Sequence, residues 1–377
     1  MRTAFTDLVG VPHPIVGLNR SPGVVAAVTN AGGFGVLAAS AYTPEELDAQ
    51  LTWIEDQTGG QPYGVDLLVP EKFAPGDPDN LVASLRAQIP AGHLAFVRDL
   101  LHRYGIPEVP PKSPTATHDE IAASLNPAGA VALLNVAFRH PISLIANALG
   151  PPPPGLVDRA RKQGVAVAAL VGQPRHAVRQ IEAGVDLLIA QGTEAGGHTG
   201  SIATMVLTPE IVDIAAGRPV LAAGGIASGR QMAAALALGA AGVWCGSVWL
   251  SSQEDVANQA IKAKFLRATS SDTVRSPTRT GKPARQLRSA WHEEWERPGS
   301  PAPLPLPLQP LLVNEAWQRI DAAAQAGHEG ALRLESFFVG QVVGSFEQIR
   351  PAGEITRQIV ADCEQRIRDL AKLEASE

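Results

Sequence analysis

VDLLIAQGTEAGGHTG, residues 185–200, joins a run of apolar residues to a segment rich in glycine. The apolar half, VDLLIA (185–190), is nearly continuous rather than alternating. Such a run is typical of a β-strand that is covered on both faces, as strands are in parallel sheets. The glycine-rich half then follows the carboxyl end of that strand.

The same kind of run recurs along the chain, bounded each time by glycine or polar residues. Runs of four to eight apolar residues with such boundaries predict buried strands. Eight can be counted, with uncertain ends: PIVGLN (14–19), GFGVLAAS (33–40), YGVDLLV (63–69), AVALLNV (130–136), VAVAALVG (165–172), VDLLIAQG (185–192), RPVLAAGG (218–225) and AGVWCGSVWL (241–250).

Helix start signals stand between several of these runs. Ser21-Pro22 and Pro174 each precede a helical pattern, and Ser228 opens another. Thr43 is an N-cap residue followed by Pro44 and two glutamates. Alternation of strands and helices predicts a parallel sheet, and eight repeats favour its closure into a (β/α)8 TIM barrel.

The chain of 377 residues is longer than one barrel of about 250 residues. We expect the barrel over residues 1–251, with a lid-like insertion at about 71–126. A small helical cap domain is expected over 252–335, divided by a proline-rich run at 297–310. Residues 336–377 are expected to return to the barrel and end in a charged helix.

The segment after the sixth run carries the main candidate for catalysis. His198 lies among four glycines in residues 191–200, together with Gln191 and Glu194. Glycines such as Gly196 and Gly197 let the backbone approach a flat ligand closely. A neutral imidazole can remove a proton from a carbon acid near neutral pH, so we expect His198 to be the base.

Two more glycine turns follow the seventh and eighth runs, AAGGI (222–226) and WCGSVW (244–249). Many barrels bind phosphate at the loops after these two strands, through backbone N–H groups. Gly224, Gly225 and Gly246 would leave such groups uncovered, and Ser247 could add a hydroxyl. Because no strand is followed by GxGxxG and a ribose-binding acid, FMN is favoured over a dinucleotide.

Taken together, QGTEAGGHTG (191–200), PVLAAGGI (219–226) and GVWCGS (242–247) resemble the nitronate monooxygenase family, formerly called 2-nitropropane dioxygenases. NAGGFGVLAAS (30–40) is also similar to the family, and TGKPAR (280–285) more weakly so. The resemblance implies an FMN-binding barrel with a small helical second domain, and His198 as the catalytic base. It implies oxidation of an alkyl nitronate by FMN to a carbonyl compound and nitrite, with O2 reoxidising the flavin. The FMN contacts that it implies are Gln191, Gly196, Gly224, Gly225, Trp244, Cys245, Gly246 and Ser247.

The chain departs from the family pattern at two places near the expected flavin. The loop after the first strand, PIVGLNRSP (14–22), is shorter and lacks the usual proline-methionine-glycine sequence. Asp66 stands where the family often has asparagine after the third strand. A carboxylate there is unusual because reduced flavin is anionic, and Arg20 could compensate its charge.

Composition narrows the classes of partner. The net charge of −6 and the pI of 5.9 do not favour binding to nucleic acid or to an anionic membrane. Two cysteines do not make a disulfide framework, and no run is long enough to span a membrane. We expect a cytoplasmic enzyme with a small-molecule substrate, O2 or another electron acceptor, and no metal. His292-Glu293-Glu294 is interpreted as a solvated helix, and His118-Asp119-Glu120 as a helix start.

Two alternatives to nitronate oxidation stay open. The same barrel could serve an FMN-dependent reductase or dehydrogenase of an enoyl- or acyl-thioester, or a quinone reductase with a nicotinamide donor. The altered first loop and the 71–126 excursion favour this alternative, since both could admit a larger substrate. The second alternative is a flavin-binding or regulatory barrel without turnover, because fold alone does not fix function.

Overall fold

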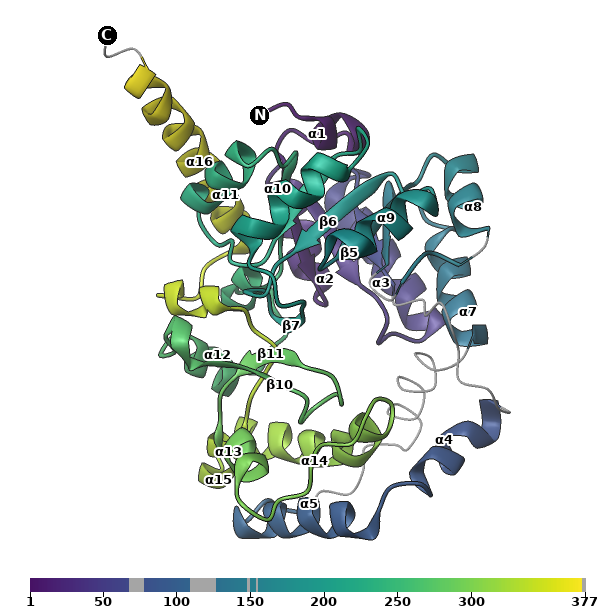
Figure 1. The fold of residues 1–377 in the computed structure, drawn as a ribbon, viewed down its shortest axis with the longest axis vertical. Helices are drawn as coiled ribbons and strands as arrows, with labels where there is room; N and C mark the ends of the chain where they lie inside the picture. The colour runs from purple at the N-terminus through teal and green to yellow at the C-terminus, as the bar shows by residue number, and fades with distance from the viewer. Residues whose placement is uncertain (68–77, 109–126, 148–149, 154, 375–377) are drawn as a thin grey trace.

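The computed structural model describes residues 1–67, 78–108, 127–147, 150–153 and 155–374. Eight parallel strands close into a barrel, which confirms the predicted fold class (Figure 1). In barrel order they are β1 (Ile15–Asn19), β2 (Phe34–Ala38), β3 (Gly64–Asp66), β4 (Leu144–Asn147), β5 (Ala166–Val171), β6 (Leu187–Gln191), β8 (Val220–Ala223) and β9 (Gly242–Cys245).

The barrel interior is packed with apolar side chains and is closed at its amino end. The short helix α1 (Ala4–Val9) places Phe5 edge-to-face against Phe34 of β2, with ring centroids 6.0 Å apart. Phe5 and Val9 belong to the same buried cluster as the inward side chains of the strands. Access to the barrel is therefore from the carboxyl ends of the strands, where barrel enzymes place their sites.

Helices of the outer layer begin at the start signals that the sequence shows, as at Thr43. The Thr43 side chain caps its helix by accepting a hydrogen bond from the Glu46 backbone N–H, and the Glu46 carboxylate accepts one from the Thr43 N–H. The long last helix packs on α11 and α2, and its end projects past the barrel (Figure 1). The outer helices are α2 (Pro22–Asn30), α3 (Pro44–Thr58), α7 (Pro127–Ala137), α8 (Leu156–Lys162), α9 (Pro174–Glu182), α10 (Thr204–Ile214), α11 (Gly229–Ala237) and α16 (Ala352–Glu374).

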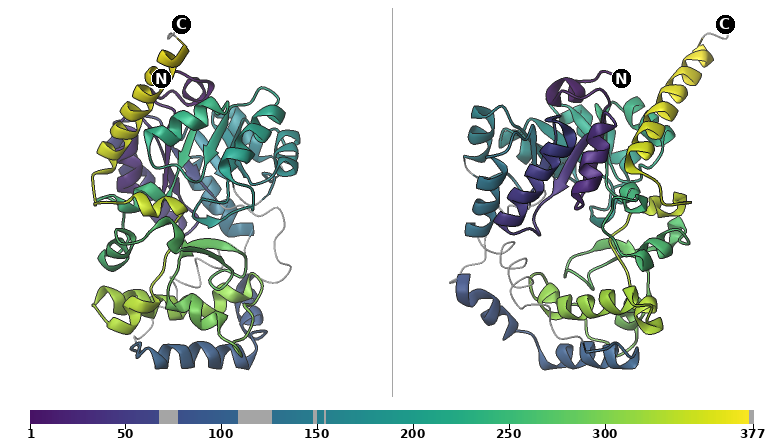
Figure 2. Two further views of the ribbon diagram at one scale, coloured as in Figure 1. Left: turned by 60° about the vertical axis from the view of Figure 1, so that its left-hand side comes forward. Right: turned by 180° about the vertical axis from the view of Figure 1, so that it is seen from behind.

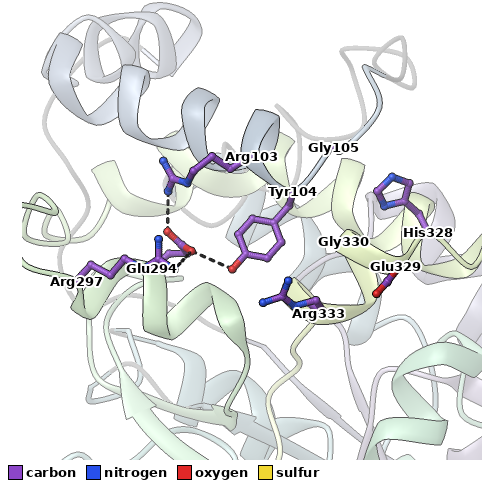
Figure 3. Close-up of a pocket in the computed structure, with 9 residues that line it drawn as sticks. All are labelled: Arg103, Tyr104, Gly105, Glu294, Arg297, His328, Glu329, Gly330 and Arg333. Atoms are coloured by element: carbon purple, nitrogen blue, oxygen red, sulfur yellow. Dashed lines mark hydrogen bonds and ion pairs between the residues drawn. The ribbon is translucent and has the colours of Figure 1, made fainter.

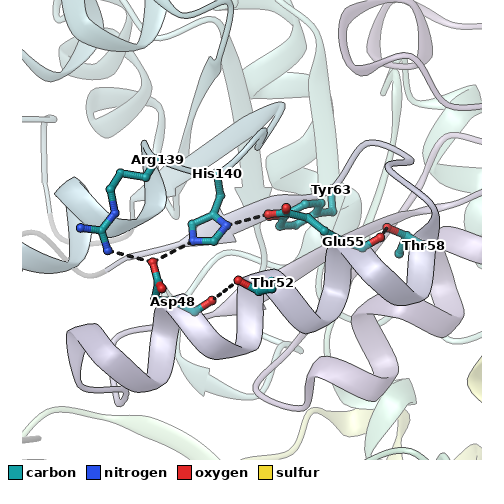
Figure 4. Close-up of polar contacts among 7 residues, drawn as sticks. All are labelled: Asp48, Thr52, Glu55, Thr58, Tyr63, Arg139 and His140. Atoms are coloured by element: carbon teal, nitrogen blue, oxygen red, sulfur yellow. Dashed lines mark hydrogen bonds and ion pairs between the residues drawn. The ribbon is translucent and has the colours of Figure 1, made fainter.

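The prediction of the fourth strand at 130–136 is wrong. That run lies in α7, and the strand is the later β4. Alanine and leucine favour helix, and a short apolar run cannot by periodicity alone be told from a buried helix. The end of α7 is held to α3 by His140, whose Nδ1 lies 2.6 Å from Glu55 and whose Nε2 lies 3.2 Å from Asp48 (Figure 4).

A second body stands at one end of the barrel, with a small sheet between the two (Figures 1 and 2). Its apolar cluster joins helices from the 71–126 excursion to helices that follow the eighth strand, and Trp291 and Trp317 pack at its centre. The expected cap also contains an antiparallel pair of strands. The elements are α4 (Pro78–Arg86), α5 (Ala91–Arg103), α12 (Gln259–Phe265), β10 (Thr273–Ser276), β11 (Ala284–Leu287), α13 (Ala290–Glu296), α14 (Leu308–Gln325) and α15 (Glu329–Leu334).

The domain boundaries themselves stay a prediction. Residues 71–77 and 109–126 of the excursion, including His118, Asp119 and Glu120, lie outside the described residues. Within the described part, α5 packs on α14, so the excursion contributes to the second body rather than to the barrel wall.

The interpretation of residues 292–294 as a solvated helix is wrong. His292 and Glu294 are both buried in α13. The Glu294 carboxylate lies 2.6 Å from Arg103 and 2.9 Å from Arg297, and it accepts a hydrogen bond from Tyr104 at 2.9 Å (Figure 3). A buried carboxylate requires such partners, which here tie the end of α5 to α13. A charge run in sequence carries no sign of these partners, because two of them lie about 190 residues away.

His292 should make the fold sensitive to acid. Burial, with a smaller contribution from the nearby charge of Arg288, lowers the pKa of His292 from 6.5 to about 4. The unfolded chain therefore binds a proton between these pH values that the native chain does not. The free energy of unfolding is therefore unaffected by His292 above about pH 6.5, and it falls by about 3 kcal/mol as the pH drops to about 4.

Urea unfolding at pH values from 4 to 7 measures this effect. The free energy of unfolding should depend less steeply on pH in His292→Gln than in the unaltered chain. The difference in slope should reach at most that of one bound proton, about 1.4 kcal/mol per pH unit. Parallel pH dependences in the two proteins would remove His292 as the cause.

Candidate functional site

The glycine turns after β6, β8 and β9 meet at one small cavity at the carboxyl ends of the strands. Its volume is about 80 Å3, well below the ~300–1,000 Å3 of a typical small-molecule site. The lining brings together eight of the predicted site residues with a few apolar neighbours: Gln191, Gly196, Gly224, Gly225, Trp244, Cys245, Gly246, Ser247, Leu18, Ala195, Ala223, Ile226 and Val342.

Three backbone N–H groups at this cavity are free to bind an anion. Gly224 and Gly225 have positive φ angles of 93° and 72°, which only glycine adopts easily. Among the described residues, no oxygen accepts a hydrogen bond from the N–H of Gly224, Gly225 or Gly246. A Cβ on Gly246 would meet only open space, apart from the Leu18 oxygen at 4.0 Å. Successive uncovered amides of this kind suit a phosphate.

Ser247 and Trp244 add polar groups to the same wall. The Ser247 hydroxyl oxygen accepts a hydrogen bond from the Gly340 N–H at 2.8 Å, which leaves its own proton for a ligand. Trp244 points into the barrel, and its indole Nε1 is buried without an acceptor among the described residues.

Cys245 reaches the cavity with its backbone rather than its thiol. The side chain belongs to the apolar cluster between the barrel and the outer helices, together with Val243 and Trp249. Burial raises the pKa of the Cys245 thiol to about 12, so it stays a neutral thiol. Its carbonyl oxygen is already taken by the Trp249 indole N–H at 2.6 Å.

The loop after β6 is fixed on both sides. The Glu194 carboxylate accepts the backbone N–H of Thr204 at 2.9 Å and so caps the amino end of α10, where negative charge is favoured. A Cβ on Gly196 would lie 2.9 Å from the carbonyl carbon of Val339. The returning segment after the second body thus forms part of the wall, and the Gln341 N–H donates to the backbone carbonyl oxygen of Glu194 at 2.9 Å.

His198 lies beside the cavity and does not line it. Gly197 and His198 form the short strand β7 (Gly197–His198), which pairs with β11 in a three-stranded sheet that the sequence did not indicate. Nε2 of His198 lies 2.8 Å from the Thr280 hydroxyl. Desolvation lowers the pKa of His198 below its ordinary value, and the charge of Lys282 lowers it further. The lowered pKa favours the neutral imidazole at pH 7.

Asp66 and Arg20, which come from the two departures from the family pattern, do not form an ion pair. Asp66 ends β3, is buried, and has one carboxyl oxygen, Oδ1, without a hydrogen-bond partner among the described residues. Burial alone raises the pKa of its carboxyl to about 7. Arg20 does not compensate it: no charge contributes to the shift of the Asp66 pKa, and the Arg20 guanidinium lies over the ring of Phe337, 4.5 Å from the centroid.

Several residues that hold the loop around His198 in place were not predicted from the sequence. Arg285 Nε donates to the Thr193 oxygen and Arg275 Nη2 to the Thr199 oxygen, each at 2.9 Å. With Thr280 they belong to the small sheet and the turn that joins its strands. The only available signal was the weak likeness of TGKPAR (280–285) to the family, which assigned these residues no role.

Neither a metal centre nor a membrane span is found in the part of the chain that the structure describes. No three His, Cys, Asp or Glu side chains gather there in a way that could hold a metal ion. None of its helices combines the length and the apolar character needed to cross a bilayer.

The sequence profile of the nitronate monooxygenase family matches residues 2–362. The chain is 54% identical, over 96% of both chains, to "Putative monooxygenase Rv1533" of Mycobacterium tuberculosis. It is 30% identical, over 100% of this chain and 99% of the relative, to the (3aS,4S,5R,7aS)-5-hydroxy-7a-methyl-1-oxo-octahydro-1H-indene-4-carboxyl-CoA dehydrogenase of Rhodococcus jostii.

Among solved structures, a nitroalkane oxidase from Streptomyces ansochromogenes superposes with a TM-score of 0.78 at 26% identity, over 98% of this chain and 100% of that one. The family profile covers nearly the whole chain, and the barrel and its glycine turns agree with it. The chain therefore belongs to the nitronate monooxygenase family and is a flavin-dependent oxidoreductase.

Proposed function

We propose that the protein binds FMN and oxidises alkyl nitronates, or the nitroalkanes from which they form, to a carbonyl compound and nitrite with O2. The observation that carries this proposal is the set of free N–H groups of Gly224, Gly225 and Gly246 at one cavity. These amides and the Ser247 hydroxyl would hold the phosphate, and Gln191, Gly196, Gly197 and Trp244 would contact the rest of the cofactor. When bound, FMN supplies the two-electron oxidation.

The chain's own task in this reaction is proton transfer and orientation. A neutral His198 accepts the α-proton of a nitroalkane, and the electron pair of the C–H bond stays on the carbon acid. The protonated ring then faces a delocalised anion, whose charge it stabilises. The neutral form required for the first step agrees with the lowered pKa of His198.

A thioester substrate is the second candidate. The relative from Rhodococcus jostii, which the chain matches over its whole length, is named as a dehydrogenase of a carboxyl-CoA compound. A proton beside a thioester carbonyl is also acidic, so the same base and flavin would serve. The shorter loop at 14–22 also favours this candidate, because it could leave room for a larger substrate.

Anaerobic reduction of the flavin tests the two candidates side by side. The purified protein is first examined by its visible absorption, and the released chromophore is identified. A nitronate, an acyl-CoA and NADH are then added separately without O2, and bleaching of the visible flavin absorption is followed. We expect bleaching by the nitronate, and nitrite after O2 is admitted. Bleaching by the acyl-CoA alone would favour the second candidate, and no bleaching by any donor would contradict both.

A further inference from the structure

The hydroxyl of Thr280 has one proton and three polar neighbours. It donates to the carbonyl oxygen of Lys282 at 2.9 Å, and the Lys282 N–H approaches its oxygen at 3.4 Å. Nε2 of His198 is the third neighbour, at 2.8 Å. A carbonyl oxygen can only accept, so the Thr280 proton is used there. The bond to His198 must then run the other way, from Nε2–H to the Thr280 oxygen.

This direction decides which nitrogen of His198 can act as a base. In a neutral imidazole one nitrogen carries the proton and the other carries the free electron pair. With the proton on Nε2, the free pair is on Nδ1. No described residue donates a hydrogen bond to Nδ1, so that nitrogen is available for a substrate proton.

The backbone around His198 is held by the same small sheet. His198 pairs with Ala284 and Gly197 pairs with Arg285 across β7 and β11. Arg285 and Arg275 occupy directly opposite positions on β11 and β10, an arrangement that like charges disfavour. Both instead donate to loop carbonyls, those of Thr193 and Thr199, on either side of His198.

We propose that Thr280 is a positioning residue of the reaction, which fixes the Nε2–H tautomer of His198 and so presents Nδ1 to the substrate. This inference rests on the proposed function in one respect, that His198 is the base. In the proton-transfer step the substrate C–H bond breaks, its proton goes to Nδ1, and its electron pair remains on the substrate. Thr280 continues to accept from Nε2–H and stabilises the imidazolium. Groups that hold metal-ligating histidines in this way typically change activity by about 10- to 100-fold, and we expect an effect of that size here.

Thr280→Val and Thr280→Ser form a matched pair of variants. Valine keeps the shape of the side chain without the hydroxyl, and serine keeps the hydroxyl. Turnover of a neutral nitroalkane is measured as kcat/KM across pH 5 to 9, with FMN content and thermal unfolding as controls. We expect a loss of about 10- to 100-fold in Thr280→Val, and recovery to within about twofold of the unaltered chain in Thr280→Ser. The acid limb of the Thr280→Val profile should move to lower pH, because the imidazolium loses an acceptor.

Nitrogen-15 NMR of histidine-labelled protein reads the tautomer without any turnover. The His198 signals are assigned by their loss in His198→Asn, and we expect the Nε2–H form in the unaltered chain and a mixture of tautomers in Thr280→Val. A Nδ1–H tautomer in the unaltered chain, or equal loss of activity in both Thr280 variants, would overturn the inference. Failure of the proposed function is a separate result, since it would appear as no turnover of nitroalkane or nitronate by the unaltered chain, while the NMR signals still report the tautomer.

Discussion

His198→Asn should lower kcat/KM for a neutral nitroalkane by about 10²- to 10⁴-fold and leave FMN bound. Asparagine can still donate to the Thr280 hydroxyl, but its amide has no basic nitrogen that could take the α-proton. Pre-formed nitronate, which has already lost that proton, should lose much less. Oxygen consumption with each form of the substrate measures the two effects, and visible absorption reports the flavin.

His102→Asn is the matched control for this substitution. His102 lies exposed on α5, within the second body and away from the cavity lining. We expect this variant to turn over both substrate forms like the unaltered chain. Equal nitroalkane rates in His198→Asn and His102→Asn would remove His198 from its proposed role.

Gly224→Ala should release FMN and destabilise the barrel. Alanine at a φ of 93° costs about 1–2 kcal/mol, because its Cβ crowds the backbone in this region. The same Cβ would lie 2.9 Å from the Ala195 nitrogen, so the loop after β6 has to move, at about 1–3 kcal/mol more. Since that loop and the Gly224 turn line one cavity, FMN affinity should fall by at least about tenfold.

Gly217→Ala is the control for Gly224→Ala, because it introduces the same kind of backbone strain without displacing a loop. Gly217 also has a positive φ, of 80°, but a Cβ there would meet no atom within 4 Å. It lies between α10 and β8, at the amino end of the strand. We expect a modest loss of thermal stability and unchanged FMN affinity, measured by flavin fluorescence titration. If Gly224→Ala binds FMN as tightly as Gly217→Ala, the Gly224 turn does not hold the cofactor.

The cavity could be predicted from sequence because its parts are local. Each glycine turn follows its own strand directly, so Gly224 and Gly246 come to one end of the barrel once the strands are parallel. The fourth strand could not be placed in this way. AVALLNV (130–136) is apolar throughout, and such a run fits a buried helix as well as a strand.

The partners of His198 depend on contacts between distant parts of the chain. Thr280 is 82 residues from His198, and the pairing of β7 with β11 has no periodic signal because β7 has only two residues. The same holds for Glu294, which the local charge run HEEWER presents as solvent-exposed but which α5 covers. Patterns within one element predict that element, whereas burial of a charged group depends on which element packs against it.

The wall that Gly340, Gln341 and Val342 add to the cavity has a consequence for the protein during its synthesis. All eight strands have been translated by residue 245, about 95 residues before this wall emerges from the ribosome. A nascent barrel therefore exposes an unfinished cavity, and capture of the proposed FMN belongs to the last stage of biogenesis. Supply of FMN should then influence the yield of mature protein more than the rate at which the barrel first collapses.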